Sequence, residues 1–276
     1  MRFLGKVRDV YTHGHHRSVV SQHAMRTVDN SAGFLLRANI LDPATTKLLD
    51  VGCGPGSISA GFGPLCKEVI AVDAEASVLE DARKAVDSAG VSNVHIQKAS
   101  AYSLPFESGT FHVVYAHQVL QHLAEPVQAI SEMRRVLKPG GLLAVRDADY
   151  SSMLVHPALA GINLWRDVYR ATCKRNGAEP DAGRFLVKWM LDAGFERTQL
   201  DLDFSVVPYA SSEACRSWGS AWEQRALKSA FSTQAVEYGL ATRSDLEYIS
   251  QSWAEWSKAP DACFYYCNGE ILASKG

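Results

Sequence analysis

Short apolar runs of four to six residues recur along the first half of the chain, and each is followed by a turn. They lie at residues 47–51, 68–73, 94–97, 110–115 and 141–146. Stretches with helical spacing separate them, starting near residue 57 and covering 77–89 and 126–137. Strands that alternate with helices in this way predict βαβ units and a parallel sheet with helices on both faces.

The segments on either side of these units are less regular. Residues 1–41 have apolar positions at three- and four-residue steps, which predict one or two amphipathic helices ending before Asp42-Pro43. Beyond residue 146 the pattern predicts helices over 159–176, 184–193, 211–228 and 244–257, and strands over 199–207 and 264–273. A helical pair is therefore expected between the last two strands.

We expect all 276 residues to form a single α/β domain, because no linker, repeat or low-complexity tract divides the chain. Residues 1–41 would form an N-terminal helical cap and residues 45–147 the binding core. Residues 148–276 would supply the remaining strands and a helical lid over about 211–258.

Composition narrows the class of protein without indicating its chemistry. Hydrophobic residues make up 47% of the chain and charged residues 21%, as in ordinary globular proteins. A net charge of −2 without basic runs argues against nucleic-acid binding, and no apolar run is long enough to span a membrane. The start of the chain has no signal-peptide core, and the six cysteines are scattered, so we expect a cytoplasmic protein with reduced thiols.

The most informative segment is a glycine-rich turn between the first strand and the helix after it. Gly52, Gly54 and Gly56 occupy every second position there, with Asp50 at the strand end. Glycine permits a positive φ and removes Cβ atoms that would keep a ligand from the backbone, while the helix start offers amide donors. The turn therefore predicts a ligand site, the alternative being a tight strand-to-helix turn without a ligand.

The spacing of the turn separates two kinds of ligand. A dinucleotide-binding turn would need glycine at position 57, which is Ser57. The carboxylate of Asp50 is unfavourable beside a pyrophosphate but suits the ammonium of an amino-acid group. Asp73, which ends the second strand, can accept both hydroxyls of a ribose. Together these residues favour a nucleoside that carries a charged amino acid.

An ordered set of motifs extends this hypothesis to a family. They are Asp50-x-Gly52-x-Gly54-x-Gly56, Asp73, Leu104-Pro-Phe106, Phe111-His-Val-Val-Tyr115 with His122-Leu123 beyond, and Leu137-Lys-Pro-Gly-Gly141. The succession, over about residues 45–147, resembles the class I S-adenosylmethionine-dependent methyltransferases, and within them the subgroup related to the ubiquinone/menaquinone-biosynthesis methyltransferases. The resemblance implies a Rossmann-like seven-stranded sheet whose last strand is antiparallel. It also implies S-adenosyl-L-methionine as the cofactor and S-adenosyl-L-homocysteine as its product.

The resemblance assigns roles to residues after the first three strands. The turn from Gly52 to Gly56, including Cys53, would lie under the methionine and ribose. Asp73 would hold the ribose hydroxyls, and Ala74 would pack on the adenine. The family usually has an aspartate for the adenine amino group where this chain has Ser100, followed by Ala101. A weaker neutral acceptor, or backbone groups, would then take that contact.

After the fourth strand, the resemblance places His117 and Gln118 beside the sulfonium and His122 on the next turn. An N-terminal helix often closes over the methionine end in this family, so Arg26 would grip the cofactor carboxylate with Tyr11 nearby. Histidines 13, 15 and 16 invite a metal site, but no cysteine or carboxylate stands at ligand spacing, and we predict no metal. A capped polar helix start is the other interpretation of this cluster.

Candidates for binding the methyl acceptor follow the fifth strand. Arg146, Asp149 and Tyr150 leave its carboxyl end, where ligands of open parallel sheets collect, although Arg146 and Asp147 could simply pair with each other. The tryptophan-rich helices, including Trp222, would be core by their spacing, or would roof the acceptor site. An apolar or aromatic small molecule would suit such a roof.

The leading hypothesis is in-line transfer of a methyl group to a small organic acceptor, with proximity and orientation as the main catalytic effect. A hydroxyl acceptor would also need a general base, for which the candidates in order are His117, His122, His13 and Asp149. The alternatives are a nicotinamide-dependent oxidoreductase and a non-catalytic nucleoside-binding module. The protein could also form a homodimer.

Overall fold

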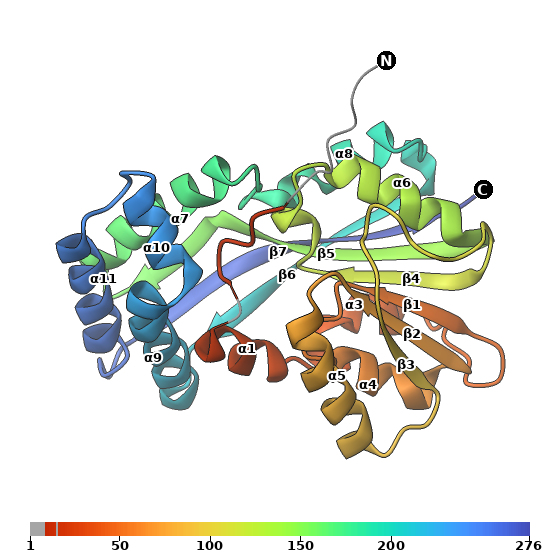
Figure 1. Cartoon of the computed structure of the whole chain (residues 1–276), viewed down its shortest axis with the longest axis horizontal. Coiled ribbons are helices and arrows are strands. Elements are labelled where there is room, and N and C mark those ends of the chain that lie inside the picture. The colour runs from red at the N-terminus through yellow and green to blue at the C-terminus, as the bar shows by residue number, and fades with distance from the viewer. Residues whose placement is uncertain (1–8, 15) are drawn as a thin grey trace.

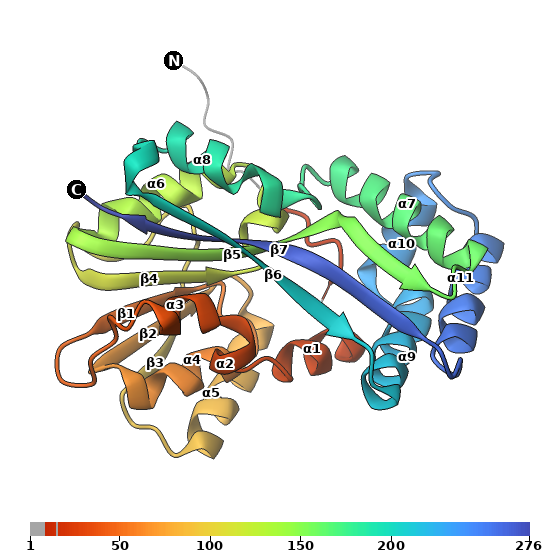
Figure 2. The ribbon, with the colours of Figure 1, turned by 180° about the vertical axis from the view of Figure 1, so that it is seen from behind.

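A seven-stranded sheet is the centre of the computed structural model, which describes residues 9–14 and 16–276 (Figures 1 and 2). The first eight residues of the expected N-terminal cap, and His15, fall outside the described residues. The strands lie side by side in the order β3-β2-β1-β4-β5-β7-β6. Their bounds are β1 (Lys47–Val51), β2 (Glu68–Asp73), β3 (Val94–Lys98), β4 (Phe111–His117), β5 (Leu137–His156), β6 (Leu200–Tyr209) and β7 (Cys263–Ser274).

The direction of β7 sets it apart from the rest of the sheet. Neighbouring strands from β3 to β5 pair in parallel, whereas β7 runs antiparallel to both β5 and β6. The predicted Rossmann-like sheet with an antiparallel last strand is thereby confirmed. Because β1, β2 and β4 are parallel, their carboxyl ends meet at one edge, where such sheets bind ligands.

The fifth strand is much longer than the predicted 141–146. Phe111 pairs with Leu137 and Val113 with Leu142, so the Pro-Gly-Gly segment that was expected only to end a helix is taken into the strand as an irregularity. At its other end, β5 stays paired with β7 as far as His156. Polar residues after Arg146 conceal this extension in the sequence, since they break the apolar run.

Helices cover both faces of the sheet. One face packs against α6 (Pro126–Val136) and α8 (Leu186–Asp192), and the other against the N-terminal helices, α4 (Ser57–Phe62) and α5 (Ala76–Ala89). The N-terminal segment forms three short helices where one or two were expected, because Thr27 starts a new helix by accepting a hydrogen bond from Asn30 N. They are α1 (Arg17–Ala24), α2 (Val28–Ser31) and α3 (Gly33–Arg37). Short 3₁₀ turns are η1 (Gly63–Leu65), η2 (Leu120–His122), η3 (Ala182–Phe185) and η4 (Arg197–Gln199).

A second core lies at the far end of the long strands β5 and β7, where the last helices gather (Figures 1 and 2). It is built from α7 (Ala160–Arg175), α9 (Ser212–Lys228), α10 (Ala230–Glu237) and α11 (Arg243–Trp256). The predicted helical pair between the last strands is therefore three helices. α10 escapes a pattern-based prediction because Ser229 alone separates it from α9. Gln22 of α1 donates to Ser217 Oγ of α9 at 2.8 Å and so links this core to the cap.

We expect Gly52→Ala to lower the free energy of unfolding by about 2 kcal/mol. Its Cβ would lie 2.4 Å from Val119 Cγ2, and φ is +74°. Gly54→Ala also has a positive φ but open space around the new methyl group, so it should cost only about 1 kcal/mol. Urea denaturation measures both, and adding Val119→Ala should recover part of the Gly52→Ala loss. Equal losses in the two glycine variants would contradict this packing.

Candidate functional site

Two adjoining cavities open at the carboxyl ends of the parallel strands. The first has a volume of about 310 Å³ and includes the glycine turn, and the second has a volume of about 490 Å³ and lies toward α9 and β6. Both sizes are in the range of small-molecule sites. The two cavities share one wall, which is formed by His23, Arg26, His117, Gln118 and His122.

Most residues predicted to bind the nucleoside line the first cavity. They are Tyr11, Arg26, Asp50, Gly52, Cys53, Gly54, Asp73, Ala74, Ser100, Ala101, His117 and Gln118. Gly56 does not line it, because this glycine starts α4 and packs against Ala82, 2.8 Å from where a Cβ would lie. Asp9, Ser57, Glu75 and Tyr102 also line the cavity and were missed.

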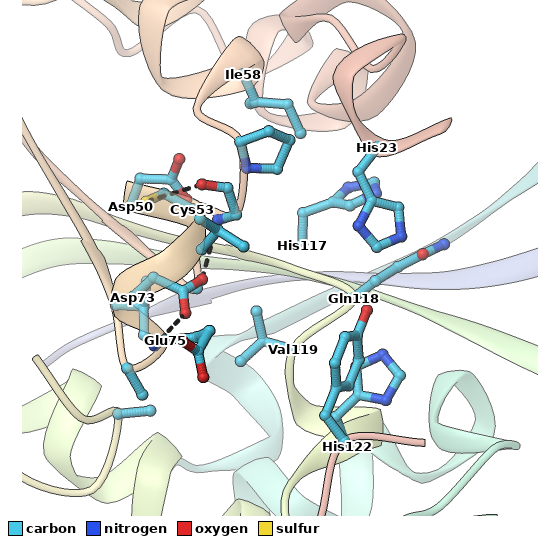
Figure 3. A pocket seen from close by; sticks show the side chains of 18 of the residues that line it. His23, Asp50, Cys53, Ile58, Asp73, Glu75, His117, Gln118, Val119 and His122 are labelled. Carbon is cyan, nitrogen blue, oxygen red and sulfur yellow. Dashed lines mark hydrogen bonds between the residues drawn. The ribbon is translucent and has the colours of Figure 1, made fainter. Parts of the chain in front are cut away.

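The glycine turn and the end of β2 are tied together by a hydrogen bond. Gly54 N donates to Asp73 Oδ2 at 3.0 Å, and Glu75 N donates to Asp73 Oδ1 at 2.9 Å (Figure 3). Apart from Gly54 and its two chain neighbours, no described residue has a heavy atom within 4 Å of where a Gly54 Cβ would be. Of the three glycines, Gly54 is therefore the one that leaves backbone open to a ligand, while Gly52 and Gly56 are needed for packing.

Asp50 is a buried carboxyl beneath this turn. It accepts a hydrogen bond from Ser59 Oγ at 2.5 Å, and burial raises its pKa to about 7. The negative charge is costly in this environment unless a cation approaches. The group is therefore suited to a ligand that carries an ammonium.

The far end of the first cavity is bordered by the loop after β3. Tyr102 N donates to Ser100 Oγ at 3.2 Å, so the serine that replaces the expected aspartate is partly engaged in its own turn. Tyr102 Oη donates to Asp9 Oδ1 at 2.7 Å, and Ala124 N donates to the same oxygen at 2.9 Å. These bonds hold the segment before α1 against the loop after β3, at the edge of the cavity.

His117 lies on the shared wall, across the first cavity from the glycine turn (Figure 3). Tyr115 Oη donates its proton to Ser31 O at 2.9 Å, so His117 Nδ1, at 3.2 Å from Tyr115 Oη, must be the donor in that contact. Its Nε2 then carries a lone pair. Burial, together with Arg26 and Arg146, holds the pKa of His117 well below its usual range, so the ring is neutral at pH 7.

His122 uses its lone pair within the protein. Gln121 Oε1 accepts from Ala148 N, which turns Gln121 Nε2 toward His122 Nε2 at 3.0 Å. Burial lowers the pKa of His122 to about 3. His13 lines only the second cavity, and its Nε2 lies 2.6 Å from Tyr169 Oη. Of the three histidines proposed as a general base, His117 is therefore the one whose Nε2 makes no hydrogen bond to a described side chain.

Gln118 and Arg26 meet at the junction of the two cavities. Arg26 Nη2 donates to Gln118 Oε1 at 2.5 Å, and Gln118 has a φ of +53°, which is uncommon outside glycine. Such backbone strain concentrates at functional sites. Tyr11 packs edge-on against His122 with ring centroids 4.8 Å apart, and burial raises the pKa of Tyr11 to about 12.

The predicted acceptor residues divide into two groups. Tyr150 and Arg146 line the second cavity, although Arg146 Nε lies 3.0 Å from Glu270 Oε1 and its Nη1 donates to Asn30 O. Arg146 thus pairs with Glu270 and not with Asp147. The other two residues predicted to serve the acceptor side, Asp149 and Trp222, line neither cavity.

The reasons for these two misplacements differ. Asp149 receives two hydrogen bonds from Arg184, at 2.6 and 2.7 Å, so its carboxylate is held away from the cavities. Trp222 is fully buried against Trp165, and the neighbouring Trp218 lines the second cavity instead. Neither residue is positioned to touch a substrate.

Arg225 is the main residue of the second cavity that the sequence analysis missed. It lies on α9 one turn after Trp222 and two after Trp218, so a cation interrupts an aromatic stripe at helical spacing. That interruption is the feature of the sequence that could have identified Arg225 as a binding residue, because a charged side chain on a buried helix face is unusual.

The described residues offer no group of three or more His, Cys, Asp or Glu side chains able to hold a metal ion. In the histidine cluster, His16 starts α1 by accepting from Ser18 N, and His15 lies outside the described residues. None of the helices in the described part of the chain has the length and hydropathy to span a bilayer.

Comparisons with known proteins agree with this geometry. Residues 49–145 match the family model described as a methyltransferase domain. An uncharacterized methyltransferase of Schizosaccharomyces pombe is 31% identical over 274 residues, which cover 96% of each chain. The ubiquinone/menaquinone biosynthesis C-methyltransferase of Vibrio cholerae is 31% identical over 171 residues, 55% of this chain and 65% of that one.

Solved structures show the same fold. A putative methyltransferase of Bacillus halodurans superposes with a TM-score of 0.59 at 20% identity, over 88% of this chain and 97% of that one. Phosphoethanolamine N-methyltransferase 2 of Haemonchus contortus, solved in complex with S-adenosyl-L-methionine, superposes with a TM-score of 0.54 at 15% identity, over 88% of this chain and 51% of that one. The chain therefore belongs to the class I S-adenosylmethionine-dependent methyltransferases, and S-adenosylmethionine is its cofactor.

Proposed function

We propose that the protein transfers a methyl group from S-adenosylmethionine to a small organic acceptor bound in the second cavity. The observation that supports this most is the shared wall of His23, Arg26, His117, Gln118 and His122 between the two cavities. A donor in one cavity and an acceptor in the other would meet there. A cavity of about 490 Å³ suits a small molecule better than a protein side chain or a nucleic acid.

The residues of the first cavity fit the charges and shape of this cofactor. Asp50 would face its ammonium, Arg26 its carboxylate, and Asp73 its ribose hydroxyls, while the open backbone at Gly54 leaves room for close approach. When bound, S-adenosylmethionine supplies an electrophilic methyl group on a positively charged sulfur. The protein then has to align the acceptor with that methyl group and exclude water.

Alignment can contribute roughly 7–11 kcal/mol to lowering the barrier, which suffices for a thiol, amine or enolate acceptor. A hydroxyl acceptor would have to lose its proton, and His117 Nε2 is the atom best placed to take it. Tyr115 fixes the tautomer that exposes this lone pair, and the lowered pKa keeps it unprotonated at neutral pH. His122 ranks second because Gln121 occupies its Nε2.

The setting we propose for this reaction is the cytoplasm. All six cysteines are unpaired, and four of them are buried, which suits a reducing compartment. We also propose that the cap, the sheet and the last helices act as one domain, because α1 and α9 together enclose the second cavity.

The nature of the acceptor can be tested with radiolabelled donor. We expect the purified protein, incubated with methyl-labelled S-adenosylmethionine and a cell extract, to place label in the fraction of small molecules. Size separation followed by scintillation counting measures this, with heat-inactivated protein as the control. Label found in protein or nucleic acid alone would contradict the proposed acceptor class.

Removing the ribose contact should weaken the cofactor. We expect Asp73→Ala to raise the dissociation constant of S-adenosylhomocysteine about tenfold or more, because charge-assisted hydrogen bonds contribute about 1.5–3 kcal/mol each. Asp87→Ala, an exposed change on α5, is the matched control and should leave the constant unaltered. Isothermal titration calorimetry measures both, and equal constants for Asp73→Ala and the unaltered protein would remove Asp73 from the site.

Cofactor affinity should depend on the ionisation of Asp50. Its pKa of about 7 in the free protein means that the carboxyl becomes protonated as the pH falls below 7 and loses its attraction for an ammonium. The dissociation constant should therefore rise below pH 7, approaching about tenfold per pH unit. Asp50→Asn should bind more weakly and show no such rise between pH 7.5 and 5.5. The same pH profile in both proteins would contradict the assignment.

A further inference from the structure

The second cavity holds a buried cation that has no acidic partner. Arg225 is only 3% exposed, and its Nε and Nη2 both donate to the carbonyl of Ser18, at 3.2 and 2.8 Å. Its guanidinium lies over the rings of Trp222 and Trp218, 5.2 and 6.0 Å from their centroids. No ion pair joins Arg225 to any described carboxylate, and residues 1–8 and 15 contain no Asp or Glu.

Other charges around this cavity do not offset Arg225. No Asp or Glu is among the residues that line it. Arg146 is neutralised by Glu270, and Arg26 also faces the first cavity, where it suits the cofactor carboxylate. The lining histidines His13 and His117 have pKa values well below their usual range because they are buried near these arginines. Without a ligand the second cavity therefore keeps an excess of positive charge.

Two residues of this cavity also carry a ring nitrogen that has no hydrogen-bond partner among the described residues. These buried nitrogens are Trp218 Nε1, which can only donate, and His13 Nδ1. An unpaired buried charge costs free energy, so the guanidinium of Arg225 favours an anionic ligand. Aromatic rings from Tyr150, Tyr209 and Tyr266 complete the surface.

We infer that the methyl acceptor is an aromatic monocarboxylic acid whose carboxylate is bound by Arg225. This inference rests on the proposed function, because it places the acceptor in the second cavity. A single negative charge matches a single unpaired guanidinium, and the tyrosine and tryptophan rings suit a flat apolar body. Since Arg225 belongs to the second cavity alone, binding the acid there leaves the rest of the molecule directed toward the shared wall.

The test compares acids with neutral molecules of the same shape. Benzoate, 4-hydroxybenzoate and phenylacetate are each paired with their amide, and binding is followed by tryptophan fluorescence, for which Trp218 and Trp222 are reporters beside Arg225. We expect at least one acid to bind about tenfold or more tightly than its amide. Arg225→Gln should abolish this difference, and Arg225→Lys should retain part of it.

The control variant is Arg216→Gln, which changes an exposed arginine on the same helix and should leave the acid preference intact. Equal binding of acid and amide in every pair, or an acid preference that survives Arg225→Gln, would overturn the inference. Should Arg225→Gln fail to fold, the comparison in the unaltered protein and in Arg225→Lys still decides. S-adenosylhomocysteine binding, measured on the same samples, reports on the first cavity, so its failure would count against the proposed function separately.

Discussion

The hydrogen bond from Gly54 N to Asp73 Oδ2 joins the ends of two neighbouring strands, and the binding site depends on it. It fixes the turn after β1 against the end of β2, while the absence of a side chain at Gly52 lets Val119 close in from the loop after β4. Three parallel strands thus bring the glycine turn, the carboxylates of Asp50 and Asp73, and His117 to one edge of the sheet. The first cavity is a consequence of this convergence.

Burial then sets the chemistry of the side chains. Exclusion of water raises the pKa of Asp50 toward 7 and lowers the pKa of His117. The Asp50 carboxylate is therefore stabilised by a bound cation, and the His117 imidazole is neutral at pH 7. The second cavity differs, since its excess charge is positive and sits on Arg225. A cationic cofactor and an anionic acceptor would each enter the cavity of opposite charge, which provides an electrostatic reason for the two to lie side by side.

Local patterns in the sequence predicted the strands, the helices between them and the glycine turn. The apolar runs, the glycine turn and Asp73 stand close together in the chain, and the strands and the first cavity follow from them. What the sequence could not reveal depends on distant partners. Arg184 donates hydrogen bonds to Asp149 and holds its carboxylate outside the cavities, and Trp222 packs against Trp165 in the aromatic core. Likewise, only the packing of α9 onto the cap exposes Arg225 as a cation without an acid.

The most direct test of the central claim is a crystal structure with S-adenosylhomocysteine bound. The account predicts that the ligand occupies the first cavity, with its ribose hydroxyls on Asp73, its amino group toward Asp50 and its sulfur facing the wall of His117 and Gln118. A ligand bound elsewhere, with the backbone at Gly54 uncovered, would contradict it.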